Sequence, residues 1–78
     1  MPAGYRFIIH SGETIEILGA ISLRGDVEAR SFGAGVIHDL MSDAATRYVT
    51  YTMEIIRGDR VVASIPFDPR GLGMSGVP

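Results

Sequence analysis

The sequence contains no cysteine and no lysine, and it has no apolar run long enough to span a membrane. Without cysteine, neither a disulfide nor a cysteine-based zinc site can form, which is compatible with a reducing compartment. A membrane-spanning helix needs about 20 consecutive apolar residues, and the N-terminus lacks the basic segment and apolar core of a secretory signal. We therefore expect a soluble bacterial protein of the cytoplasm that has no membrane partner.

Basic charge is also scarce. All seven basic residues are arginine, nine residues are acidic, and the formal net charge is −2. Proteins that bind nucleic acid usually present a strongly basic surface to the phosphates. The composition therefore disfavours direct nucleic-acid binding.

The chain has 78 residues, which is enough for one domain. A chain of this size buries only about 60% of its unfolded surface, and its free energy of unfolding is expected to be about 4 to 12 kcal/mol. Burial against a partner subunit would add to this small total.

One stretch, residues 26–42, has a sustained helical period. Its apolar and small residues form one stripe at Ala29, Phe32, Gly33, Val36, Ile37 and Leu40. Asp26 is expected to be the N-cap, and its charge suits the start of a helix. Gly33 lies on the buried stripe, where a missing side chain would let the helix approach the sheet. Gly35 points outward, and no packing reason explains it.

The remaining segments have the alternation of β-strands: residues 5–10, 13–23, 48–57 and 61–67. Gly19 interrupts the second segment, which predicts one bent strand or two short ones. Gly58 and Asp59 predict a hairpin turn of type I′ or II′. Pro66 cannot donate a ladder hydrogen bond, so the last strand should lie at a sheet edge. Residues 68–78 have no periodicity and are expected to form a flexible tail.

These elements predict an α+β domain over residues 1–67, with a four-stranded, mainly antiparallel sheet in β-β-α-β-β order and one helix on one face. We expect the strand order 2-1-3-4. The expected core packs the helix, through Ala29, Phe32, Val36, Ile37 and Leu40, against Phe7, Ile9, Tyr51, Met53 and Ile65.

The layout resembles a family of short alphaproteobacterial proteins of unknown function. The similar features are Met1-Pro2 before an aromatic strand, the Ser11-Gly12 turn, Gly19, the helix start Asp26-x-Glu28-Ala29, and the hairpin at Gly58-Asp59. Residues 32–35 depart from the alanine-rich helix of that family. The resemblance implies a fold and no activity. The order of elements is also similar to antitoxin-type domains that share part of the double-stranded-RNA-binding fold.

Alternation places a mixed polar and apolar set on the sheet face away from the helix. From this face we predict an interface formed by Arg6, Ile8, Thr50, Thr52, Glu54, Ile56 and Val62, with His10 and Ser64 beside it. Arg6 and Glu54 are expected to pair across strands. The alternative is that the second strand, which has no proline, pairs through its edge with a second copy. The sequence ranks the face slightly ahead of the edge.

No catalytic, metal or cofactor site is predicted. His10, Glu13 and Glu16 are close in sequence, but a strand-turn-strand need not bring them together around a metal. His38 and Asp39 are neighbours on a helix, so their side chains should diverge. With two histidines, no serine can be matched to a base.

The sequence therefore favours a non-enzymatic protein-interaction module that acts as a homodimer or with a protein partner, because unburied apolar strand residues are present. The alternative is an antitoxin-like or nucleic-acid-associated regulatory domain, in which this domain would bind a toxin or form a dimer core.

Overall fold

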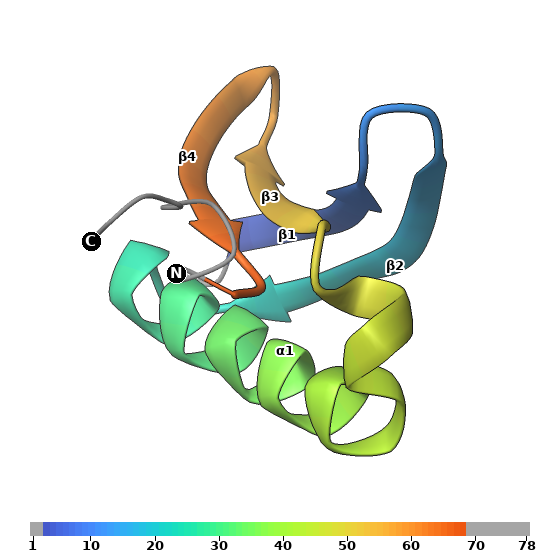
Figure 1. Cartoon of the computed structure of the whole chain (residues 1–78). Coiled ribbons are helices and arrows are strands. Elements are labelled where there is room, and N and C mark those ends of the chain that lie inside the picture. Colours follow the sequence, from blue (N-terminus) through green and yellow to red (C-terminus); the bar gives the residue numbers. More distant parts are fainter. Residues whose placement is uncertain (1–2, 69–78) are drawn as a thin grey trace, which may run out of the picture.

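The computed structural model describes residues 3–68, which form four strands and one helix (Figure 1). The elements are β1 (Ala3–His10), β2 (Ile15–Leu23), α1 (Asp26–Tyr48), β3 (Thr52–Arg57) and β4 (Arg60–Pro66). All neighbouring strands are antiparallel, in the order β2-β1-β3-β4. The predicted fold class and strand order are confirmed. Met1-Pro2 and all of the predicted tail except Asp68 lie outside the described residues.

Strand β2 is bent, as the sequence predicts. Its pairing with β1 shifts register between Phe7 and Ile8, so that Phe7 lies opposite Gly19 and Ile8 lies opposite Ile17. Leu18 is therefore the extra residue of a β-bulge. Gly19 next to it has a φ of 141°, a backbone conformation that residues with a side chain rarely adopt. The interruption in the apolar pattern thus marks a bend within one strand.

The start of α1 differs from the prediction that Asp26 is the N-cap. The N-cap is Gly25, and no side chain caps the helix there. The Asp26 carboxylate instead accepts a hydrogen bond of 2.7 Å from the hydroxyl of Tyr5, 21 residues away in β1. Glu28 reaches back and accepts a hydrogen bond of 2.7 Å from the backbone N–H of Arg24. The Asp26 side chain therefore makes a tertiary contact with β1, and the helix begins without a side-chain cap.

The end of α1 also differs from the prediction. The helix continues to Tyr48, with non-helical φ and ψ angles at Ala44, so the predicted strand start at Tyr48 is wrong and β3 begins at Thr52. The ring centroid of Tyr48 lies 5.2 Å from that of Tyr51 and 5.7 Å from that of Phe67. This aromatic contact holds the last turn against the segment that follows β4.

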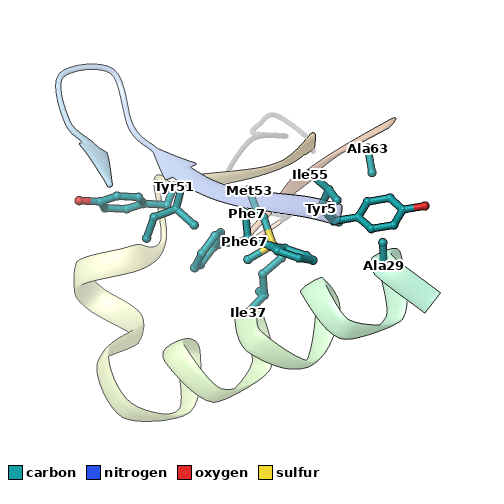
Figure 2. Close-up of a cluster of buried hydrophobic side chains, with 10 residues drawn as sticks. Tyr5, Phe7, Ala29, Ile37, Tyr51, Met53, Ile55, Ala63 and Phe67 are labelled. Atoms are coloured by element: carbon teal, nitrogen blue, oxygen red, sulfur yellow. The ribbon is translucent and has the colours of Figure 1, made fainter. Parts of the chain in front are cut away.

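The core lies between α1 and one face of the sheet (Figure 2). It comprises Tyr5, Phe7, Ile9, Ala29, Ile37, Tyr51, Met53, Ile55, Ala63 and Phe67. Val36, Leu40 and Ile65 pack against it with partial burial. The prediction of a buried Phe32 is wrong, because 43% of this side chain is exposed. It lies where α1 is separated from the bent part of β2.

Gly33 has the packing role that the sequence predicts. A Cβ atom built at this position would lie 2.9 Å from both Ile55 Cδ1 and Met53 Sδ. Both of these side chains are fully buried. The helix therefore crosses the sheet closely at Gly33, whereas a Cβ at Gly35 would meet nothing within 4 Å.

The hairpin between β3 and β4 turns at Gly58, which has a φ of 66°. Asp59 does not have a positive φ, so the turn cannot be type I′, which needs positive φ at both central residues. The pairing of β3 with β4 shifts between Ile55 and Ile56, which leaves Val62 as an extra residue. Pro66 is the last residue of β4, and β4 is an edge strand, as predicted.

Candidate functional site

The outer face is the sheet face away from α1. On this face Ile8 lies opposite Glu54, which lies opposite Ser64, and Arg6 lies opposite Ile56. The structure therefore places five members of the predicted interface on this face: Arg6, Ile8, Thr52, Glu54 and Ile56. It does not place all seven there.

Two members of the predicted interface lie elsewhere. Thr50 belongs to the turn between α1 and β3, because the helix extends further than predicted, so its assignment to the sheet is wrong. Val62 is the extra residue of the β4 bulge, and Val61 is the residue that lies opposite Ile56. Val62 is partly buried and packs against the core, whereas Val61 is exposed. The bulge shifts the alternation of β4 by one residue.

The polar groups of the outer face pair differently from the prediction. Glu54 lies 3.4 Å from His10 Nε2, rather than pairing with Arg6. The Arg6 guanidinium donates a hydrogen bond of 3.3 Å to the carbonyl of Gly58 in the β3–β4 hairpin. Both His10 and Glu54 are partly exposed, and even a fully charged pair at such a site contributes only about 0.2 to 1 kcal/mol.

Exposed large apolar side chains gather along β2. Ile15 and Ile17 are 73% and 72% exposed and lie opposite His10 and Ile8, so they belong to the outer face. Leu18 and Ile21 are exposed on the helix side, next to the exposed ring of Phe32. We call this set the β2 apolar surface: Ile15, Ile17, Leu18, Ile21 and Phe32. The other exposed large apolar residues of the described chain are Val27 and Val61.

An open groove of about 370 Å³ runs between β2 and α1. It is lined by Phe7, Leu18, Gly19, Ala20, Ile21, Phe32, Val36 and Leu40. Gly19 contributes no side chain to its floor, and the Phe32 ring leans on Phe7 with their centroids 5.2 Å apart. The groove is the part of the core that the sheet and the single helix leave uncovered.

A polar cluster lies at the start of α1. The Tyr5 hydroxyl donates to Asp26, and Arg57 lies 3.8 Å from the same carboxylate oxygen and 5.9 Å from the Tyr5 ring centroid. The hydrogen bond to Asp26 raises the pKa of Tyr5, and burial of the ring acts in the same direction. Nearby, a hollow of about 530 Å³ is lined by Arg24, Gly25, Asp26, Val27, Glu28 and Ser31. Asp26 and Glu28 are both already hydrogen-bonded, so this cluster ties β1 to α1 and β3.

The residues weighed as metal ligands do not converge. His10 faces Glu54 on the outer face, whereas Glu16 lies 3.7 Å from Arg47. Among residues 3–68 no group of three histidine, aspartate or glutamate residues is placed to hold a metal ion. His38 and Asp39 approach to 3.7 Å, closer than their divergence on a helix predicts, and both are more than four-fifths exposed. Both side chains are therefore solvated.

Comparison of the chain with models of protein families, with curated proteins and with solved structures finds no match in any of the three. The resemblance to the alphaproteobacterial family therefore stays a prediction. Over the described residues, the helix does not combine the length and the apolar character needed to cross a membrane.

The sequence reasoning missed Leu18, Ile21 and Phe32 as surface residues. A signal for Leu18 and Ile21 exists in the sequence: β2 has apolar residues on both sides of its alternation, and only one charged residue, Glu16, among its nine. A strand of this kind needs cover on both faces. The sequence gives no such signal for Phe32, because it lies on the same apolar stripe of the helix as residues that are buried.

Proposed function

We propose that the protein is a non-enzymatic interaction module that associates with a second copy of itself. The observation that supports this proposal is the β2 apolar surface, which collects five of the seven exposed large apolar side chains of the described residues on or beside the edge strand β2, two on the outer face and three on the helix side. Isolated apolar residues are normal on protein surfaces, whereas contiguous apolar patches mark interaction sites.

The small size of the chain supports the same proposal. One helix covers one face of the sheet, and β2 is nearly all exposed. Each square ångström of apolar surface that leaves water stabilises by about 25 cal/mol. Association therefore adds to a free energy of unfolding that is expected to be about 4 to 12 kcal/mol.

The test is the mass of the purified protein at micromolar concentration, measured by light scattering over a dilution series. We expect a dimer that dissociates on dilution, with a dissociation constant that rises when Ile17, an exposed residue of β2, is replaced by lysine. A wild-type protein that stays monomeric up to the highest soluble concentration contradicts the proposal. Stoichiometric copurification of a different protein from the native host, with no self-association, would favour the antitoxin-like alternative.

A further inference from the structure

This inference rests on the proposed self-association. We infer that a second copy of the chain covers the groove between β2 and α1, and that the two copies pair through their β2 strands. In this arrangement two β2 strands run antiparallel and join the two sheets into one of eight strands. A two-fold axis perpendicular to the sheet relates the copies, so both helices lie on the same face. The open side of each groove then faces the open side of the other.

The edge of β2 is suited to strand addition. It is nine residues long, has no proline, and nearly all of its residues are exposed. Natural edge strands usually avoid pairing with another chain because they are short or carry charged residues or prolines. β2 has Glu16 as its single charge, and its bulge lies near the middle, leaving residues 19–23 as a regular segment. Main-chain hydrogen bonds along this segment would join the two copies.

The charges at the two ends of β2 favour an antiparallel copy over a parallel one. Glu16 lies near its start, and Arg24 follows its last residue. Antiparallel pairing brings the Glu16 end of each strand toward the Arg24 end of the other. Parallel pairing would place like charges side by side, which is unfavourable. The segment is therefore complementary in charge to its own antiparallel copy.

The area that a stable dimer needs points to the groove as well as the strand. A standard interface buries about 800 Å² on each partner, which is about one sixth of the 5103 Å² of accessible surface of this chain. The edge of one strand is too narrow to supply this area alone. Leu18, Ile21 and Phe32 on the helix side supply the remainder, since they meet their counterparts when the two grooves face each other.

The test compares lysine substitutions inside and outside this surface. Leu18→Lys and Ile21→Lys place a charge in the groove, and each is expected to raise the dimer dissociation constant by about 100-fold, because the charge is buried without a partner. Val27→Lys and Val61→Lys are matched controls, since both valines are exposed and lie outside the β2 apolar surface. They are expected to leave the dissociation constant within about twofold of wild type. Far-UV circular dichroism confirms that each variant is folded.

A disulfide provides a second readout that does not depend on weakening the fold. The wild-type chain has no cysteine, so Ala20→Cys introduces a single thiol in the regular segment of β2. Mild oxidation is expected to cross-link Ala20→Cys into a covalent dimer much faster than Val61→Cys. Both alanine and valine here are exposed, so accessibility is matched.

The outcomes separate this inference from the proposed function. A monomeric wild-type protein contradicts both the proposed self-association and the β2 arrangement. A wild-type dimer that persists in Leu18→Lys and Ile21→Lys, or a cross-linking rate for Ala20→Cys no faster than for Val61→Cys, overturns the β2 arrangement and leaves self-association standing. Loss of the dimer only in Ile8→Glu and Ile56→Glu would place the interface on the outer face instead.

Discussion

An alanine at position 33 would place a methyl group where the core is already filled. The added Cβ would lie 2.9 Å from Ile55 Cδ1 and 2.9 Å from Met53 Sδ, both on fully buried side chains. Forcing extra atoms into a packed core costs about 1 to 3 kcal/mol. Replacing glycine by alanine within a helix raises the free energy of unfolding by about 1 kcal/mol. We therefore expect Gly33→Ala to lower the free energy of unfolding by as much as about 2 kcal/mol.

Gly35→Ala is the matched control, because its Cβ meets nothing within 4 Å. It keeps the helix gain without the packing cost, and we expect it to raise the free energy of unfolding by about 1 kcal/mol. The assay is guanidinium unfolding followed by circular dichroism, with protein concentration held fixed because association shifts apparent stability. If Gly33→Ala is as stable as Gly35→Ala, the close approach of α1 to β3 does not exist as described.

Four further substitutions test other parts of the fold. In the wild-type protein the pKa of Tyr5 is raised on folding. The protonated Tyr5 therefore contributes to the free energy of unfolding fully below the ordinary tyrosine pKa of about 10, and this contribution is lost as the pH rises through the pKa of the folded state. Tyr5→Phe removes the titrating group, so its stability should fall less steeply at alkaline pH than that of wild type. Thermal melts between neutral and alkaline pH measure this, and parallel profiles for the two proteins would contradict it. Phe32→Ala should cost about 1 to 2 kcal/mol and Met53→Ala about 2 to 5 kcal/mol, since only Met53 is fully buried; equal losses in denaturant titrations would count against this burial pattern. Gly58→Ala should cost about 1 to 2 kcal/mol because the φ of 66° is strained for alanine, and an unchanged melting temperature would disprove that strain.

The parts of the fold that follow from short-range periodicity were predictable from the sequence. The alternation of β1 and β3 correctly identifies the buried sides of Phe7, Ile9 and Met53, and the helical stripe correctly places Ala29 and Ile37 in the core. Gly33 was recognisable because a glycine on a buried stripe needs a packing reason. The edge position of β4 followed from the missing N–H of Pro66.

The errors at the two ends of α1 arise from tertiary contacts that compete with the local sequence pattern. Asp26 has the side chain of an N-cap, but Gly25 takes that position and the Asp26 carboxylate accepts the hydrogen bond of the Tyr5 hydroxyl instead. Tyr48 suits a strand by alternation, but its contacts with Tyr51 and Phe67 fix it at the end of a helix. Tyr5 is 21 residues from Asp26, and Phe67 is far from Tyr48 in the sequence, so no local window contains these two partners, whereas Tyr51 is close to Tyr48 along the chain.

The candidate site was less predictable than the fold. A bulge shifts the two-residue period by one, which exchanges the roles of Val61 and Val62 relative to the simple alternation. The second bulge, at Leu18, bends β2 and leaves Phe32 uncovered. Bulge positions depend on the pairing of two strands, and the pattern of either strand alone does not reveal them.

The two edges of the sheet differ in a way that bears on how many copies can assemble. β2 offers a nine-residue edge without proline, with Glu16 as its single charge and a regular segment over residues 19–23, whereas β4 begins at Arg60, carries its bulge at Val62 and ends at Pro66. A sheet with two adhesive edges adds copies without limit and grows into a filament, whereas a sheet with one adhesive edge is satisfied by a single neighbour. If the protein self-associates through β2 as proposed, the blunted edge of β4 limits the assembly to two copies and leaves no end from which a fibre can extend.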